Sequence, residues 1–313
     1  MDAISLLLNE SVFRIDAHAF CRDIEAFIRR TVADANRDGV VVAISGSLDS
    51  SVVAALCANA LGNERVTGLL LPERFGNPEA DRYGELIARH LGIASRRIGI
   101  SPVIRAMGAA NLIFTITAGR ERWKDKVNAY LAKSGHSIAG DYEAFLRGVL
   151  DAKGCRKVAM INAKQRARAL IAYRFADERN LLVAGSAHRT ENGVGLFCKY
   201  GIDDAADLMP LKRIYRSQIL QLAECLGIPE EIRKRSPNPD ILPGVTDKYL
   251  AYFGMDAQTV DLLLYGVEHG MPDPDIAKAL NLEAPAVAKL REVIRLSALS
   301  RDHALAWEPP DSL

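Results

Sequence analysis

The stretch that decides the fold is Val40-Val41-Val42-Ala43-Ile44-Ser45-Gly46-Ser47-Leu48-Asp49-Ser50-Ser51. Its first five residues are apolar and mostly β-branched, which predicts a strand buried on both faces of a parallel sheet. Ser-Gly-Ser then predicts a tight turn, and Asp49 and Ser50 are residue types that favour the start of a helix. Such a strand, turn and helix point free backbone N–H groups and the positive end of the helix dipole at one place. That place suits a phosphate group.

Strands and helices are expected to alternate on both sides of this stretch. The apolar patterns predict helices at 18–35, 52–61 and 78–91, and further strands at 66–71, 96–100 and 181–184. This alternation predicts right-handed crossovers and an α/β fold whose doubly wound parallel sheet is flanked by helices. The ligand crevice of such a sheet lies at the carboxyl ends of the strands, which is where residues 45–50 fall.

Composition excludes several classes of protein. Of 313 residues, 49% are hydrophobic and 25% are charged, and 40 basic residues face 39 acidic ones, so no basic field favours nucleic acid. No apolar run is long enough to predict a membrane span, and the first ten residues lack the basic start of a signal peptide. The five cysteines are widely spaced without a CxxC pair, which argues against a disulfide framework or a zinc site and favours the cytoplasm.

The chain is expected to form one α/β domain over residues 1–268 and a helical extension over 269–313 packed on the same domain. The pattern is loose between residues 101 and 157, where glycines recur, so we expect a lid or an oligomer-contact insertion there. The mixed charges of 120–126 predict a solvated helix face, and apolar residues 4–8 predict a surface that packs on a partner or on the body.

The pattern Ser45-Gly46-x-x-Asp49-Ser50 resembles the pyrophosphate-binding loop of the ATP pyrophosphatases. These enzymes split ATP between its α and β phosphates to adenylate a substrate. An ordinary strand-to-helix turn is the alternative interpretation of this stretch alone. The family usually has Gly where this chain has Ser47, so a Ser held at positive φ would strain the loop.

Later segments resemble the NAD synthases, a family of ATP pyrophosphatases, and they occur in the family's order. The matching segments are Asn162-x-Lys164-x-Arg166-x-Arg168, Gly185-Ser186-Ala187-His188-Arg189-Thr190-Glu191, Lys199-Tyr200-Gly201, Ala206-Asp207-Leu208-Met209-Pro210 and Pro237-Asn238-Pro239-Asp240. The resemblance implies an adenine nucleotide α-hydrolase-like fold and the ATP-dependent amidation of deamido-NAD through an adenylate, with release of AMP and pyrophosphate. Only about forty residues precede the central strand, too few for a glutaminase domain, so free ammonia is the expected nitrogen source.

Chemistry and resemblance together assign roles to these residues. ATP requires a metal and preorganised donors, so Asp49 and Glu191, at the ends of two strands, are expected to share Mg²⁺ and to be catalytic with Arg216. As alternatives, Asp49 caps its helix and Glu191 is a surface acid. The residues expected to bind ATP are Ser45, Gly46, Ser47, Asp49, Ser50, Ser51, Ser186, Arg216 and Asn238. The resemblance places deamido-NAD against Asn162, Arg166, Tyr173, Lys199 and Asp207. It also implies a two-fold homodimer.

This sequence departs from the family's pattern at several positions. Ile202 follows Lys199-Tyr200-Gly201 where the family usually has Asp, so the nearest carboxylate is expected to be displaced. Arg216 stands for a family Lys, which changes a point charge into a planar fork, and Asn238 stands for a Thr. The basic pair before Pro309-Pro310 is reduced to Arg301. A divergent paralogue that adenylates another carboxylate is therefore the second hypothesis.

A hypothesis from another class concerns residues 275–295, whose pattern of helix, short turn and helix has the spacing of a DNA-binding helix-turn-helix. The second helix offers Lys289, Arg291 and Arg295 against Glu283 and Glu292, which is little positive charge for an operator. Helices that close the α/β body are the favoured interpretation.

Overall fold

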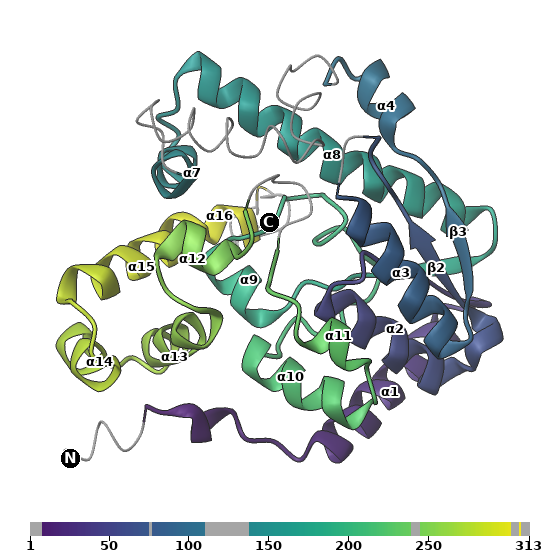
Figure 1. The fold of residues 1–313 in the computed structure, drawn as a ribbon, viewed down its shortest axis with the longest axis horizontal. Helices are drawn as coiled ribbons and strands as arrows, with labels where there is room; N and C mark the ends of the chain where they lie inside the picture. The colour runs from purple at the N-terminus through teal and green to yellow at the C-terminus, as the bar shows by residue number, and fades with distance from the viewer. Residues whose placement is uncertain (1–7, 75–76, 110–137, 239–244, 302–306, 308–313) are drawn as a thin grey trace, which may run out of the picture.

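The computed structural model describes residues 8–74, 77–109, 138–238, 245–301 and 307. Its centre is a four-stranded sheet in the order β3-β2-β1-β4, with every neighbouring pair parallel (Figure 1). The strands are β1 (Gly39–Ala43), β2 (Val66–Leu70), β3 (Ala94–Arg97) and β4 (Leu181–Ala184). In this order the chain turns back between β1 and β4, so the switch point of a doubly wound sheet lies between these two strands.

Helices cover both faces of the sheet. One face packs on α1 (Ala17–Asp34), α2 (Leu48–Leu61), α3 (Pro78–Leu91) and α10 (Arg216–Cys225), and the other packs on α4 (Ser101–Ala106) and the long α8 (Ala152–Asp177). Along β1, Val40 and Val42 belong to the first core and Val41 to the second, because successive side chains of a strand point to opposite faces. Burial on both faces explains why this strand is an unbroken apolar run.

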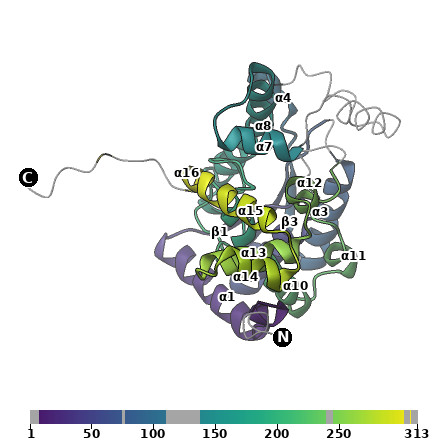
Figure 2. The same ribbon diagram turned by 90° about the vertical axis from the view of Figure 1, so that its left-hand side faces the viewer.

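A helical cluster forms the left-hand part of Figure 1 and faces the viewer in Figure 2. It contains η1 (Glu10–Phe13), α7 (Ile138–Leu146), α9 (Arg189–Val194), α12 (Lys248–Phe253), α13 (Ala257–Glu268), α14 (Asp273–Leu280), α15 (Ala284–Leu296) and α16 (Ala298–Arg301). Its core includes Leu8 and Val260, which precede the predicted boundary at residue 268 in the sequence, and Val287, which follows it. The division of the chain at that residue stays a prediction.

The remaining short elements are η2 (Asn63–Arg65), which leads into β2, and α11 (Glu230–Arg233), which follows α10. Several predicted features lie outside the described residues: the run 120–126, residues 110–137 of the segment 101–157, residues 4–7, Pro239-Asp240 and Pro309-Pro310. Among the helices that are described, none combines the length and the apolar character that crossing a membrane requires.

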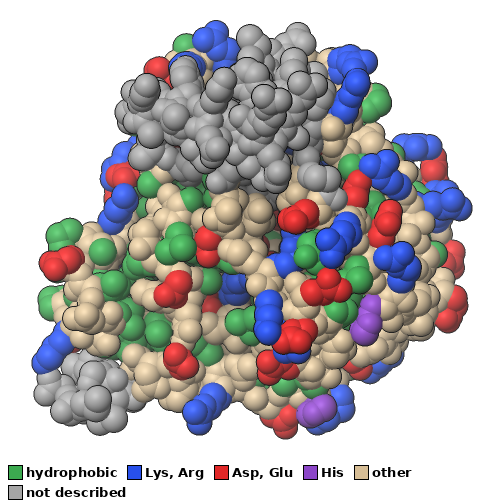
Figure 3. Space-filling view, viewed as in Figure 1, with side chains coloured by type: hydrophobic (Ala, Val, Ile, Leu, Met, Phe, Trp, Pro, Cys, Tyr) green, Lys and Arg blue, Asp and Glu red, His purple; other side chains and the backbone are tan. Residues whose placement is uncertain are grey.

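The helix-turn-helix pattern corresponds to α14 and α15, whose apolar residues pack into the core of the helical cluster. Arg291 donates to Asp273 at 2.7 Å and Arg295 donates to Glu292 at 2.7 Å, so both basic side chains have acidic partners. On the face seen in Figure 3, acidic and basic side chains are interspersed. These helices therefore close the α/β body, and their charge is not arranged for a phosphate backbone.

Candidate active site

The loop after β1 has the geometry that its small residues predict. Gly46 has φ 67°, and a Cβ there would lie 2.2 Å from Cβ of Tyr83, so only glycine fits. Ser47 has φ −71° and ψ 158°, an extended conformation that a serine adopts without strain. Its hydroxyl caps α2 by accepting from Ser50 N at 3.4 Å. The N-cap of this helix is therefore Ser47, whereas the sequence had suggested Asp49 or Ser50. Asp49 lies inside the first turn of the helix.

The loop is held by its own hydroxyls and by one arginine. Ser51 Oγ donates to the Ser47 carbonyl at 2.7 Å, and Ser45 N donates to Ser50 Oγ at 3.4 Å. Arg235, which follows α11, donates to the Gly46 carbonyl at 2.6 Å, and its guanidinium lies 4.2 Å from the centre of the Tyr83 ring. A preorganised loop of this kind binds an anion without first paying a large ordering entropy.

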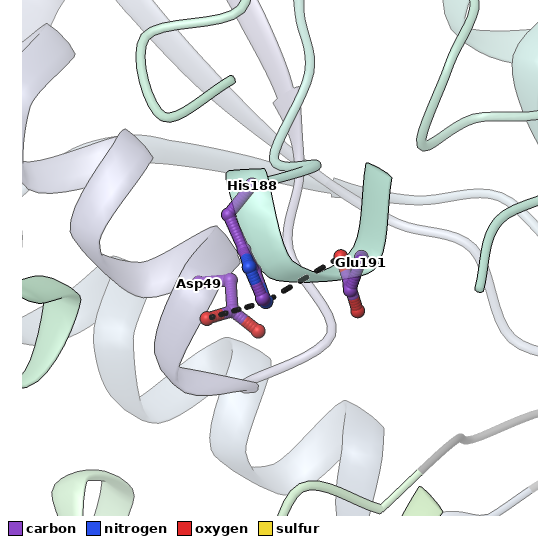
Figure 4. Close-up of side chains that lie close together, drawn as sticks. All are labelled: Asp49, His188 and Glu191. Carbon is purple, nitrogen blue, oxygen red and sulfur yellow. Dashed lines mark ion pairs between the residues drawn. The ribbon is translucent and has the colours of Figure 1, made fainter. Parts of the chain in front are cut away.

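The two predicted carboxylates meet at the switch point with a histidine between them (Figure 4). Asp49 comes from α2, whereas His188 and Glu191 come from the start of α9, directly after β4. His188 Nε2 lies 3.8 Å from Asp49 Oδ1 and 3.6 Å from Glu191 Oε2. One ligand atom from each of the three residues lies within 4.8 Å of the other two, a spacing that suits a single metal ion.

Each carboxylate is also paired with a cation from a later part of the chain. Arg216 Nη1 lies 3.0 Å from Asp49 Oδ1 and 3.3 Å from Oδ2, and Lys248 forms an ion pair with Glu191. Burial by itself would raise the pKa of Asp49, but Arg216 and then His188 outweigh it and lower that pKa. Asp49 is therefore ionised at neutral pH.

His188 is fully buried, and neither of its ring nitrogens has a hydrogen-bond partner within the described part of the chain. Burial lowers its pKa against the opposing effect of Glu191 and Asp49, so the imidazole is neutral at pH 7. The Tyr249 hydroxyl is likewise buried without a partner among the described residues. Orphaned polar atoms of this kind are rare in proteins and indicate a place for water, an ion or substrate.

The side chains of this cluster fit Mg²⁺, because the ion prefers carboxylate oxygens as ligands. It also usually keeps several bound waters, which a neutral side chain such as His188 can orient by hydrogen bonds. Among the described residues, the carboxylate oxygens of Asp49 and Glu191 would be its ligands.

A cavity of about 380 Å³ opens beside the cluster. It is lined by many of the residues that the sequence assigns to ligands, namely Ser45, Ser47, Asp49, Asn162, Arg166, Ser186, Glu191, Lys199, Arg216 and Asn238. Gly46, Ser50 and Ser51 are not among the lining residues, and Ser50 and Ser51 form hydrogen bonds within the loop. The structure thus brings the predicted loop, both carboxylates and one face of α8 to a single space.

Two predicted residues lie away from this cavity. The Tyr173 hydroxyl donates to Asp207 Oδ1 at 3.3 Å, and the other oxygen of Asp207 accepts from Val183 N at 2.7 Å. Arg166 donates to the Lys199 carbonyl at 3.3 Å, and Lys199 Nζ donates to the Leu299 carbonyl at 2.8 Å. Arg166 and Lys199 therefore reach the cavity, whereas Tyr173 and Asp207 hold each other at the far end of α8.

The carboxylate that the sequence predicts to be displaced after Gly201 is Asp203. Ile202 is buried in the core beneath α8, and the next residue, Asp203, lines the cavity and accepts from Gln165 Nε2 at 2.8 Å. Burial and then the charge of Glu191 raise the pKa of Asp203 to about 6. The one-residue shift thus leaves a carboxyl group on the cavity wall.

Four residues of the site had no role assigned to them from the sequence: His188, Asp203, Arg235 and Lys248. For Asp203 the sequence predicted only that a carboxylate is displaced past Ile202. His188 had a signal, because it stands three residues before Glu191 and so shares its helical face. Arg235 and Lys248 had none, because no pattern along the chain connects them with the loop.

A parallel sheet with an anion-binding loop and two carboxylates at its switch point defines an α/β enzyme that acts on a phosphate-containing nucleotide. The family model described as NAD synthase matches residues 20–126 and 124–304. The chain therefore belongs to the NAD synthase family.

Relatives match over most of their length. An NH(3)-dependent NAD(+) synthetase of Mesorhizobium japonicum is 35% identical over 282 residues, covering 86% of this chain and 88% of the relative. Another, of Rhizobium meliloti, is 33% identical and covers 93% and 90%. Solved structures share the fold. They include an NMN synthetase of Francisella tularensis, with TM-score 0.69 and 22% identity over 95% and 100% of the two chains. An NH3-dependent NAD synthetase of Campylobacter jejuni has TM-score 0.64 and 21% identity over 94% and 100%.

Proposed function

We propose that this chain is an ammonia-dependent NAD synthetase, which converts deamido-NAD, ATP and ammonia into NAD, AMP and pyrophosphate. The observation that carries the proposal is the meeting of Asp49 and Glu191 at the switch point, next to the loop 45–47. The family and the relatives support the same reaction.

The triphosphate of ATP binds at the loop after β1, where backbone N–H groups and the start of α2 favour negative charge. Asp49 and Glu191 hold Mg²⁺, which neutralises charge that develops on the phosphates. Arg216 lies beside Asp49 and stabilises the same charge as a fixed donor. The carboxylate of deamido-NAD attacks the α-phosphate, pyrophosphate leaves, and ammonia then displaces AMP from the adenylate to give the amide.

Deamido-NAD occupies the part of the cavity under α8. Asn162, Arg166 and Lys199 line this part, and their amide, guanidinium and ammonium groups suit the diphosphate and the ribose hydroxyls of a dinucleotide. Tyr173 and Asp207, which were also expected to bind deamido-NAD, lie away from this cavity and hydrogen-bond to each other, so the proposal gives them no contact with the ligand there.

Two attributes accompany the reaction. A two-fold homodimer is supported by Leu170, which is 64% exposed on α8 and stands one turn beyond Arg166. The cytoplasm is supported by the five cysteines, all of which carry free thiols.

The test incubates the protein with ATP, Mg²⁺, ammonia and deamido-NAD and measures NAD with a coupled dehydrogenase, and AMP and pyrophosphate separately. Asp49→Asn and Glu191→Gln are expected to abolish turnover while the fold is kept, and Arg166→Ala is expected to raise KM for deamido-NAD. Release of ADP would contradict the proposal. The divergent paralogue would be favoured if pyrophosphate is released with another carboxylic acid, such as the acid form of the mononucleotide NMN, and none is released with deamido-NAD.

Glutamine in place of ammonia tests the nitrogen source. We expect no turnover once free ammonia is removed, and turnover with glutamine alone would contradict the assignment.

A further inference from the structure

Among the described residues, Lys248 is the only lysine or arginine that forms an ion pair with Glu191. It is the first residue of α12 and lines the same cavity as Ser45, Ser47 and Asp49. Its ion pair with Glu191 is nearly buried, with 14% of the lysine side chain and 13% of the glutamate side chain exposed. The pair Arg216–Asp49 is similarly enclosed, with 8% and 10% exposed.

The position of Lys248 does not depend on this ion pair. The Asp247 carboxylate caps α12 by accepting from Tyr249 N at 2.8 Å and Leu250 N at 3.1 Å. Lys248 N donates to the Pro237 carbonyl at 3.1 Å, which ties the start of the helix to a segment of the cavity wall. Because the backbone is anchored without the side chain, the four-carbon chain of Lys248 can change partner while α12 stays in place.

Metal binding at the two carboxylates favours such a change. Mg²⁺ would neutralise much of the charge of Asp49 and Glu191, which weakens their ion pairs with Arg216 and Lys248 inside an enclosed cavity. An unpaired charge in such a place is strongly unfavourable. The phosphates of ATP arrive with the metal and carry the negative charge that both cations then need.

We propose that Lys248 is a phosphate-binding residue that exchanges partners: it neutralises Glu191 in the nucleotide-free protein and binds a phosphate oxygen of ATP when the metal occupies Glu191. The inference rests on the proposed function for the identity of the nucleotide. Its consequence is a coupling between metal and nucleotide, in which each binds more tightly when the other is present.

The test compares wild type, Lys248→Met, Lys248→Arg and, as matched control, Lys234→Met, which removes a surface lysine paired with Glu230. Two affinities are measured: that of Mn²⁺ alone, by electron paramagnetic resonance, and that of α,β-methylene-ATP with Mn²⁺, by calorimetry. Circular dichroism and thermal unfolding check that each variant is folded.

Lys248→Met is expected to bind Mn²⁺ alone about threefold or more tightly, because Glu191 is freed, and the nucleotide analogue about tenfold or more weakly, because a charged contact is lost. Lys248→Arg and Lys234→Met are expected to behave like wild type in the nucleotide titration. Every other combination overturns the exchange. Weaker binding of both ligands would make the lysine a structural tie, and unchanged binding of the analogue would remove it from the phosphate site.

These binding measurements separate the inference from the assigned reaction. Opposite shifts in a protein that forms no NAD would sustain the role of Lys248 and overturn the reaction. NAD formation by the wild type, together with unchanged affinities in Lys248→Met, would sustain the reaction and overturn the role of Lys248.

Discussion

The buried carboxylate of Asp261 accepts two hydrogen bonds from Ser217, one from the backbone N at 2.8 Å and one from Oγ at 2.7 Å. It also accepts from the hydroxyl of Thr190, which in turn accepts from Arg216 N at 3.0 Å. One side chain of α13 therefore fixes the first turns of α9 and α10, the helices that carry Glu191 and Arg216. The helical cluster, which includes α9 and α13, thus helps to position Glu191 and Arg216 at the candidate site.

Asp261→Ala is predicted to be strongly destabilising, because it leaves several buried donors without an acceptor. Each such donor costs about 1–3 kcal/mol, so the free energy of unfolding should fall by about 3–5 kcal/mol, and kcat should fall with it. Urea unfolding and steady-state kinetics measure both. Asp256→Ala removes only the exposed cap that accepts from Thr259 N, and is expected to cost about 1 kcal/mol. Equal losses in the two variants would contradict the positioning role of Asp261.

Arg216→Met is predicted to lower kcat/KM for ATP by about 10- to 150-fold, the equivalent of one charged contact of about 1.5–3 kcal/mol to the reacting phosphates. Arg216→Lys keeps the charge and should recover part of the loss, because a point charge replaces a planar fork. The variants are compared by pyrophosphate release over a series of ATP concentrations. Activity of Arg216→Met within threefold of wild type would exclude Arg216 from the phosphate site.

The elements of the sheet were predictable where the sheet is buried. Strands β1, β2 and β4 and helix α3 were placed within one or two residues, because apolar runs and glycines mark them. Strand β3 was placed too late: the prediction was 96–100 and the strand is Ala94–Arg97. Its residues are exposed at the edge of the sheet, and the apolar Ile98 and Ile100 that suggested a strand lie after it, in the core on the α8 side.

The candidate site was predictable where its residues follow a strand. Glu191 and Asp49 follow β4 and β1, and parallel strands bring their carboxyl ends to one edge. Lys248 and Arg235 reach the same place from helices and loops far along the chain, which only tertiary packing determines. The loop residue Ser47 shows the same limit, because its extended conformation, with φ −71°, could not be read from the residue type.

Asp203 predicts a pH dependence of stability. Its pKa is raised from 3.8 to about 6, so the native state holds this proton more tightly than the unfolded chain does. Between about pH 4 and pH 6 the contribution of Asp203 to stability therefore falls as pH rises, and above pH 6 it is constant. Asp203→Asn should gain about 1–3 kcal/mol relative to wild type between pH 4.5 and pH 7.5, measured by urea unfolding. A difference between the two proteins that does not change with pH would contradict the raised pKa.

The homodimer is tested at Leu170, whose side chain is 64% exposed on α8. If this face of α8 meets its copy across a two-fold axis, Leu170→Glu places a charge in an apolar contact and should weaken association by about a hundredfold or more. Light scattering at micromolar concentration is then expected to give twice the chain mass of 34.2 kDa for wild type and the single mass for the variant. Leu220→Glu, on α10 and 42% exposed, is the matched control and should remain dimeric. A monomeric wild type would contradict the homodimer, and a Leu170→Glu protein that stays dimeric would remove this face of α8 from the interface.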